Sequence, residues 1–261
     1  MHRALTIAGS DSGAGAGIQA DLKTFAALGV YGCSVITAVT AQNTREVRAS
    51  LTLPSEIVTA QIEAVIVDIG ADAVKTGMLP TAAIVEAVAA AVRDFDLPLL
   101  VVDPVMVAST GQRLIDEDAV AAIRTELVPR ALVVTPNAAE AGILTGIVVD
   151  SEARQREAAR SLVDLGARAA LVTGGDLGGD ESLDVLVDPD GERLFRSPRV
   201  PGTAHGSGCT FSAAIAAGLA RGSTIGEAAH LAHAYVARAL ARRLRIGSGS
   251  LVLDHLGDGA G

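Results

Sequence analysis

Aromatic residues are scarce in this sequence, which has no tryptophan, two tyrosines and four phenylalanines among 261 residues. Aliphatic side chains must therefore form the core of a chain that is 49% hydrophobic. The two cysteines, Cys33 and Cys209, are too few for a disulfide framework, which predicts a reducing compartment. We expect Cys33, inside a strand-like run, to be a core residue.

Targeting and membrane signals are also lacking. No signal peptide precedes the first strand-like run, and charged residues interrupt every apolar run before it reaches membrane-spanning length. The net charge of −9 argues against a nucleic-acid or acidic-membrane partner. It does not exclude a phosphate-bearing substrate, because salt screens distant charges within about 8 Å and local N–H donors then decide. We expect a cytoplasmic protein.

Apolar runs alternate with amphipathic segments along the chain. Strands are predicted at residues 4–8, 32–40, 73–76, 99–102, 131–135 and 169–173, an exposed strand at 46–53, and a hairpin at 183–187 and 192–195. This alternation predicts an α/β fold with a mostly parallel sheet covered by helices on both faces. No repeat or long linker divides the sequence, so we expect a single domain over residues 1–261. Ligands of such folds bind at the carboxyl ends of the strands.

One glycine-rich segment lies where a helix begins. The segment His205-Gly206-Ser207-Gly208-Cys209-Thr210 precedes an apolar helical pattern at 211–219. Free N–H groups and the helix dipole make such a position an anion site. Cys209 falls in the first turn, where a lowered thiol pKa would make it a candidate base. The alternative, a loop that caps a packed helix with a buried cysteine, remains open on these residues.

Two further polar clusters follow predicted strands. Asp103 comes directly after a wholly apolar run, where burial in the core would be costly, so we expect it to face the cleft. Asn137 and Glu140 have the spacing of a helix capping box. Asp103 and Glu140 also suit a hydrated magnesium ion, which prefers carboxylates and water. A purely structural capping role is the alternative for each cluster.

The first glycine cluster, at residues 9–17, is not a recognised nucleotide fingerprint. The dinucleotide pattern G-x-G-x-x-G would need glycine at Ile18 or Ala20, and no acid ends the second strand. A Walker A loop is excluded, because the only lysines are Lys23 and Lys75 and neither follows a glycine.

Six motifs together resemble a known family. They are Gly9-Ser10-Asp11-Ser12-Gly13 with its continuation to Thr24, Ala38–Thr44, Lys75-Thr76-Gly77-Met78-Leu79, Val102-Asp103-Pro104-Val105-Met106, Thr135-Pro136-Asn137 with Glu140, and the loop at 205–210. In this order they resemble the hydroxymethylpyrimidine/phosphomethylpyrimidine kinases of thiamine synthesis. The resemblance runs from Ala4 to about Leu244. It implies a ribokinase-like fold, a three-layer α/β sandwich with a mostly parallel central sheet.

The resemblance also implies an activity and a set of roles. The enzyme would use ATP and Mg²⁺ to phosphorylate the hydroxymethyl group of 4-amino-5-hydroxymethyl-2-methylpyrimidine and then its monophosphate. Cys209 would be the general base, and Gly206, Ser207 and Gly208 would donate N–H groups to the phosphoryl group. The other implied contacts are Asp103 and Glu140 for magnesium, Asn137, Thr173 and Gly175 for ATP, and Gly9, Asp21, Gln42, Met78 and Val105 for the pyrimidine. The family also suggests a homodimer.

Three departures from the family pattern leave alternatives open. Ala14 stands where glycine is common, Thr173 stands where many members have lysine, and the tail at 246–250 lacks the usual lysine and Gly-Pro-Val ending. Thr-Gly-Gly also occurs in pyridoxal kinases, so a kinase of vitamin B6 salvage is the alternative. A degenerate fold that only binds a vitamin is another, although the retained acids and Cys209 favour an enzyme.

The histidines suggest two interpretations. Glu227, His230 and His233 share a predicted helix, but successive three-residue steps diverge across its face, which favours a surface or interface role over a metal site. His205, directly before the glycine-rich loop, is a candidate for orienting that loop.

Overall fold

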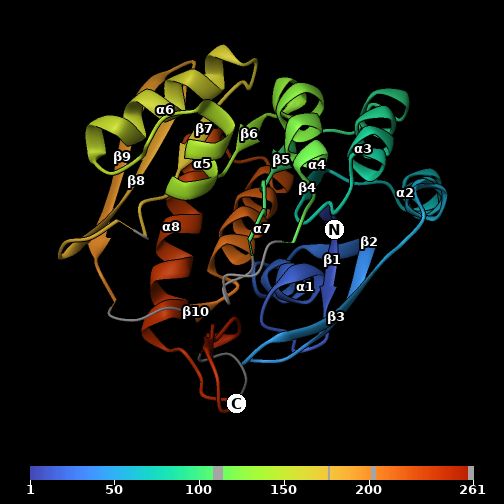
Figure 1. Cartoon of the computed structure of the whole chain (residues 1–261), viewed down its shortest axis with the longest axis horizontal. Coiled ribbons are helices and arrows are strands. Elements are labelled where there is room, and N and C mark those ends of the chain that lie inside the picture. Colours follow the sequence, from blue (N-terminus) through green and yellow to red (C-terminus); the bar gives the residue numbers. More distant parts are fainter. Residues whose placement is uncertain (108–113, 176, 201–203, 258–261) are drawn as a thin grey trace.

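The computed structural model describes residues 1–107, 114–175, 177–200 and 204–257. In this part of the chain a central sheet has nine strands in the order β3-β2-β1-β4-β5-β6-β7-β8-β9 (Figure 1). The strands are β1 Arg3–Asp11, β2 Tyr31–Gln42, β3 Val47–Thr52, β4 Ala73–Thr76, β5 Leu100–Val102, β6 Val133–Val134, β7 Ala170–Val172, β8 Glu181–Asp188 and β9 Gly191–Pro198. Neighbouring strands from β2 to β7 are parallel, whereas β3, β8 and β9 pair antiparallel.

Helices cover both faces of the sheet. One layer contains α1 Gly17–Ala27, α7 Ser207–Ala220 and α8 Ile225–Ala241. The other contains α2 Ser55–Asp68, α3 Ala82–Asp94, α4 Glu117–Ala122, α5 Ala138–Thr145 and α6 Glu152–Asp164. A π-helical segment, Ile123–Leu127, and a 3₁₀ turn, Val128–Arg130, extend α4. The predicted three-layer arrangement is confirmed.

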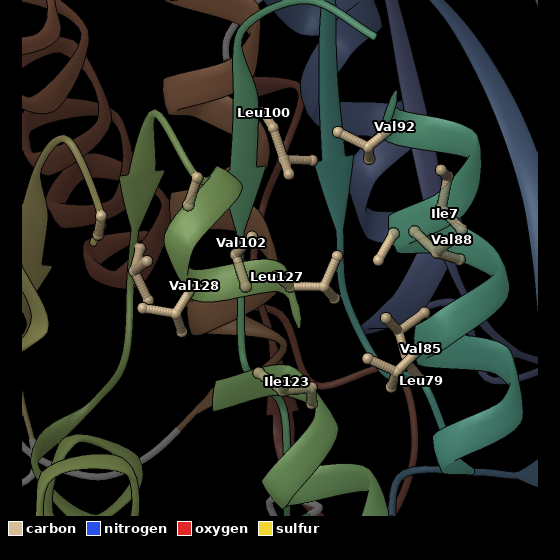
Figure 2. Close-up of a cluster of buried hydrophobic side chains, with 14 of the residues drawn as sticks. Ile7, Leu79, Val85, Val88, Val92, Leu100, Val102, Ile123, Leu127 and Val128 are labelled. Carbon is tan, nitrogen blue, oxygen red and sulfur yellow. The ribbon is translucent and has the colours of Figure 1, made fainter. Parts of the chain in front are cut away.

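The two layers follow from the period-2 alternation of side chains along a strand. Val102 of β5 belongs to the hydrophobic cluster under α2–α6, and its neighbour Val101 belongs to the cluster under α1, α7 and α8. In the first cluster, Val85, Val88 and Val92 come from one face of α3 and point toward the strands (Figure 2). Aliphatic side chains at helical spacing therefore fill this core almost without aromatic residues.

Most predicted elements are present. The hairpin is confirmed as β8 and β9, paired down to Asp188 and Gly191, and β3 is an exposed edge strand. The Thr224–Glu227 and Asn137–Glu140 spacings both form capping boxes. Ser151 lies at the N-cap of α6, but its side chain makes no capping hydrogen bond. None of the helices in the described ranges is long and apolar enough to cross a bilayer.

A small second sheet joins the C-terminal segment to the glycine-rich loop. Strand β10, Ala204–His205, pairs in parallel with β11, Leu251–Val252. The sequence gives no signal for this pairing, because each strand has only two residues and they are far apart in the chain. The pairing places residues 244–257 beside the start of α7.

A buried ionic cluster connects three elements of the fold. The Nζ atom of Lys75, on β4, lies 2.8 and 2.9 Å from the two carboxylate oxygens of Asp21 on α1. Asp103, directly after β5, is 3.7 Å from the same Nζ atom, and the Thr6 hydroxyl donates to Asp21 at 2.6 Å. Burial raises the pKa of Asp21 and of Asp103, and Lys75 opposes the rise. Burial alone would lower the pKa of Lys75, but the surrounding negative charge raises it above its ordinary value.

This cluster makes a prediction for stability. Lys75→Met leaves Asp21 and Asp103 buried without their cation, so we expect the free energy of unfolding to fall by about 3–5 kcal/mol. Urea unfolding followed by circular dichroism measures the change. The control is Lys23→Met at the only other lysine, which is exposed and donates to the Ala14 carbonyl. An equal loss of stability in both variants would contradict the prediction.

Candidate active site

The glycine-rich loop lies at the N-terminus of α7, as predicted. Gly206 is the N-cap with φ of 86°, a left-handed conformation that favours glycine. A Cβ atom at Gly206 would also collide with the carbonyl oxygen of Gly15. Ser207, Gly208 and Cys209 form the first turn, whose N–H groups have no carbonyl partner within the helix. The N–H of Thr210 makes the first intrahelical bond, to the Gly206 carbonyl at 2.9 Å.

The predicted lowering of the Cys209 pKa is wrong. Burial raises the pKa of this thiol to about 12. Lys75 and the Gly17 N–H favour the thiolate, while Asp103 and Asp21 disfavour it. The helix N-terminus therefore does not decide the protonation state, because the buried carboxylates and the loss of solvent outweigh it. In the free protein Cys209 is a neutral thiol.

A cavity of about 170 Å³ lies beside this loop. Three of its lining residues are those implied for ATP, namely Asn137, Thr173 and Gly175, and they meet Ser207 and Gly208 of the loop there. The apolar part of the lining comes mainly from α7 and α8 and from the end of β9. These residues are Pro198, Val200, Phe211, Val236, Ala237 and Leu240.

The cavity also contains a pair that the sequence interpretation missed. His233 Nδ1 lies 2.7 Å from Asp184 Oδ2, and Asp184 Oδ1 accepts the N–H of Gly174 at 3.2 Å. The hydrogen bond to Asp184 raises the pKa of His233. The expected surface or interface role of His233 is wrong, since its side chain is 12% exposed and faces β8. The pair connects α8 to the loop that follows β7.

The two carboxylates implied for magnesium are both engaged inside the protein. Asp103 accepts a hydrogen bond from the Ser212 hydroxyl at 2.8 Å. Glu140 accepts the N–H of Asn137 at 3.0 Å and, through its other oxygen, the N–H of Met106 at 3.4 Å. Glu140 thus connects the start of α5 to the loop after β5. Within the described ranges, no group of three or more His, Cys, Asp or Glu side chains is arranged to hold a metal ion.

The residues implied for the pyrimidine are only partly brought together. Gly9 and Met78 are in contact, because a Cβ atom at Gly9 would overlap the Met78 methyl group. Val105 is half-buried in the loop after β5. Asp21 needs a correction: its side chain is wholly buried and bonded to Lys75, so it lies behind the site rather than in its lining. Nothing in the sequence pattern shows whether Asp21 lies behind the site or in its lining.

Gln42 is held from within the protein. Its Nε2 atom lies 3.0 Å from Nε2 of His205, and its Oε1 accepts from the Thr40 hydroxyl at 3.2 Å. These contacts are shared, because Nε2 of His205 also bonds Asp11 and the Thr40 hydroxyl also donates to the Ser10 carbonyl, so the half-buried carboxamide is placed at the end of β2 without being locked there. Its place beside the glycine-rich loop keeps it among the candidate substrate contacts.

Asp11 is a further residue that sequence reasoning missed. Its carboxylate accepts the N–H groups of Gly13, Gly15 and Ala16 at 2.8, 3.1 and 2.9 Å. Nε2 of His205 lies 2.8 Å from the same carboxylate. Burial opposes ionisation, but His205 and the loop N–H groups outweigh it and hold the pKa of Asp11 below its ordinary value. Asp11 therefore shapes the first glycine loop and connects it to the second.

A mostly parallel sheet with two glycine loops at its carboxyl edge, and a cavity beside a helix N-terminus, is the arrangement of a protein that binds a phosphate-bearing small molecule. The family model described as phosphomethylpyrimidine kinase matches residues 11–254, and the chain belongs to this family.

Individual relatives agree with this assignment. A hydroxymethylpyrimidine/phosphomethylpyrimidine kinase of Rhizobium meliloti is 52% identical over 258 residues, covering 97% of this chain and 96% of that protein. A phosphomethylpyrimidine kinase structure from Clostridium difficile has 40% identity and a TM-score of 0.83, covering 92% of this chain and all (100%) of that one. An ADP complex of Bacillus subtilis pyridoxal kinase has 37% identity and a TM-score of 0.91, covering 98% and 97%.

The raised pKa of Cys209 makes a prediction for thiol reactivity. At pH 8 a thiol with a pKa of about 12 is ionised to about one part in 10⁴, whereas a free thiol is ionised to about one quarter. The more basic thiolate is also more nucleophilic, which recovers part of the difference. We therefore expect iodoacetamide to alkylate Cys209 about 40- to 100-fold more slowly than the cysteine of a short unstructured peptide.

Mass spectrometry on the Cys33→Ala variant measures this rate at Cys209 alone. The rate should still rise about tenfold per pH unit between pH 8 and 10, because a group with a raised pKa remains mostly protonated there. Alkylation as fast as that of the cysteine in the unstructured peptide would contradict the raised pKa.

Proposed function

We propose that this protein is an ATP- and Mg²⁺-dependent kinase of thiamine diphosphate biosynthesis. Its substrate would be 4-amino-5-hydroxymethyl-2-methylpyrimidine, and then the monophosphate of that alcohol. The observation that carries the proposal is the cavity where Asn137, Thr173 and Gly175 meet Ser207 and Gly208 of the glycine-rich loop. A nucleotide in this cavity would have its phosphates beside N–H donors and its base against apolar side chains of α8.

The glycine-rich loop would act on the phosphoryl group in flight. The substrate hydroxyl oxygen forms a bond to the γ-phosphorus, and the bond to the bridging oxygen of the departing ADP breaks. N–H groups of Ser207, Gly208 and Cys209 would stabilise the charge on the transferred group, which is the main contribution that a protein makes to such reactions. The α7 dipole adds to this effect.

Cys209 would receive the proton of the substrate hydroxyl. In the free protein the raised pKa keeps the thiol protonated, so its own proton must first pass to solvent before the thiolate can accept the proton of the substrate hydroxyl. Lys75 and the Gly17 N–H are the groups that favour the thiolate. A loose transition state for phosphoryl transfer places only modest demands on the base. The small population of thiolate is therefore compatible with a role of Cys209 as the base.

Asp103 and Glu140 fit the ligands that Mg²⁺ takes, since this ion is usually bound through one or two carboxylates, waters and substrate phosphates. We propose that these two residues hold the ion, directly or through water. When bound, the ion neutralises charge on the phosphates. Ser212 and Met106 orient the two carboxylates by the hydrogen bonds that they donate.

Three further statements belong to this proposal. From the family resemblance we infer a homodimer. We also infer a cytoplasmic location, which fits a chain with two cysteines and no disulfide framework. Residues 1–261 would act as a single kinase domain. Sedimentation equilibrium of the purified protein tests the dimer, and a monomer mass at micromolar concentration would reject it.

The base assignment predicts a loss of activity without a loss of folding. We expect Cys209→Ala to lower kcat about 10²- to 10⁴-fold, as removal of a general base does. The control is Cys33→Ala at the other cysteine, which is buried under α2 and α3 and should keep its kcat. A coupled assay for ADP, with and without the pyrimidine alcohol, measures both variants. A Cys209→Ala enzyme within threefold of the wild type would make this cysteine structural.

Gln42 decides between the pyrimidine and the pyridoxal alternative. An aminopyrimidine edge presents a ring-nitrogen acceptor beside an amino donor, and a carboxamide matches both. Pyridoxal presents a phenolic oxygen and an aldehyde, which leave the amide poorly paired. We expect the pyrimidine alcohol to have the higher kcat/KM, and Gln42→Leu to narrow the difference by lowering kcat/KM for the pyrimidine.

Competition kinetics with both alcohols measures this preference. Equal or better use of pyridoxal by the wild type would reject the thiamine assignment and favour vitamin B6 salvage. Loss of ATP turnover with either alcohol, together with retained binding of the pyrimidine, would instead favour a binding protein that has lost catalysis.

A further inference from the structure

The C-terminal segment, defined as residues 244–257, contacts the glycine-rich loop on its upstream side. Strand β11 pairs with β10 so that Leu251 lies opposite Ala204 and Val252 lies opposite His205. Leu244 forms an isolated bridge with Val252, which folds the segment back on itself. The residue that follows β10 is Gly206, the N-cap of α7. The upstream end of the loop is therefore fixed by backbone pairing.

The same segment also contacts the loop on its downstream side. Nε2 of His255 lies 3.0 Å from the hydroxyl oxygen of Thr210, which directly follows Cys209. Thr210 is wholly buried and His255 is 5% exposed. The His255 carbonyl accepts the Tyr235 hydroxyl of α8 at 2.6 Å. The His255 backbone is thus bonded to α8, and its imidazole contacts the first turn of α7.

The charge state of His255 suits a permanent contact. Burial and the nearby charge of Lys23 lower its pKa to about 4, while Asp254 and the Leu253 carbonyl oppose this only in part. The ring is therefore neutral at physiological pH, and its bond to Thr210 does not depend on a proton being gained. A buried neutral ring so placed positions its partner rather than sensing pH.

The Thr210 hydroxyl has a specific alternative that His255 prevents. A threonine inside a helix readily donates to the carbonyl four residues earlier and bends the helix there. At Thr210 that carbonyl belongs to Gly206, which already accepts the Thr210 N–H at 2.9 Å. In the tautomer whose Nε2 accepts the hydroxyl hydrogen, this hydrogen is not available to the Gly206 carbonyl and the first turn stays regular. The N–H groups of Ser207, Gly208 and Cys209 then keep a common direction.

We propose that His255 is a positioning residue for phosphoryl transfer, acting through Thr210 on the loop at 206–209. This inference rests on the proposed role of that loop as the binder of the transferred phosphoryl group. N–H donors that act in the transition state must be held to within a fraction of an ångström, so a displaced first turn lowers kcat more than it weakens substrate binding.

Substitutions at position 255 test the inference. We expect His255→Ala to lower kcat about 10- to 100-fold, with KM for ATP and for the pyrimidine alcohol changed by less than about threefold. His255→Gln places an amide where the imidazole has Nε2 and should restore most of kcat. His255→Asn places its amide where the imidazole has Nδ1 and should not. Equal kcat in all three variants and the wild type would overturn the inference.

A double-mutant cycle tests whether the effect passes through Thr210. Thr210→Val removes the hydroxyl while keeping the shape, so it should lower kcat about as much as His255→Ala. The double variant should be no slower than either single variant, because both remove one interaction. Additive losses would overturn the proposed path. If His255→Ala does not fold, the kcat of Thr210→Val still shows whether the bond between Thr210 and His255 affects turnover.

Further comparisons distinguish a positioning role of His255 from a purely structural role, and from a failure of the proposed function. Tyr235→Phe removes the bond to the His255 carbonyl but leaves the imidazole on Thr210, so we expect a lower Tm with kcat unchanged. If Tyr235→Phe and His255→Ala lose kcat in proportion to Tm, His255 is only structural and the inference fails. If Cys209→Ala loses activity but His255→Ala does not, the proposed function stands and the inference fails. If the wild type phosphorylates no pyrimidine alcohol, the proposed function fails and the premise of this inference fails with it.

Discussion

The buried ammonium of Lys75 is the constraint on which the rest of the structure depends. Removing a cation and two carboxylates from water costs several kcal/mol per ion, and their attraction offsets this only when the geometry is good. Lys75 meets Asp21 on α1 and Asp103 after β5, so β4, β5 and α1 must all be in place together. A shift of β4 by one residue would turn Lys75 to the other face of the sheet, into an apolar layer. The cluster therefore specifies both register and layer.

The same cluster sets the chemistry of the site. The charges of Lys75 on β4, Asp103 after β5 and Asp21 on α1 all act on the Cys209 thiol. The proton affinity of the proposed base is thus determined partly behind the site, by Lys75 and Asp21, which also stabilise the fold. Ser212 lies between the two, because its hydroxyl oxygen is 2.8 Å from Asp103 and 3.0 Å from the Cys209 carbonyl, and its one hydrogen can go to either acceptor. Stability and proton transfer cannot be altered independently here.

The local sequence pattern predicts the layers of this protein. It does not predict the polar pairs of the site, because their members are far apart in the sequence. Continuous apolar runs indicate the parallel strands, and capping-box spacing indicates the starts of α5 and α8. Asn137, Thr173 and Gly175, which the resemblance implies for ATP, line one cavity. The partner of Lys75 is 54 residues away and that of Asp11 is 194 residues away, and no spacing rule reports such pairs. The predicted direction of the Cys209 pKa shift is wrong for the same reason. The local sequence shows that Cys209 lies in the first turn of a helix, but it does not show that the thiol is buried.

Three histidines show how the loops at the carboxyl edge are fixed. His205 pairs with Asp11, His233 with Asp184 and His255 with Thr210, and each pair joins two segments remote in sequence. Apolar packing is non-directional and suffices to stack helices on a sheet, but it does not orient an N–H group. Hydrogen bonds are directional, and buried ones are costly to break. A core of small aliphatic residues has few aromatic rings with which to brace its loops. In this protein buried polar pairs take that role, and three of their members, Asp184, His233 and His255, lie outside the motifs that identify the family.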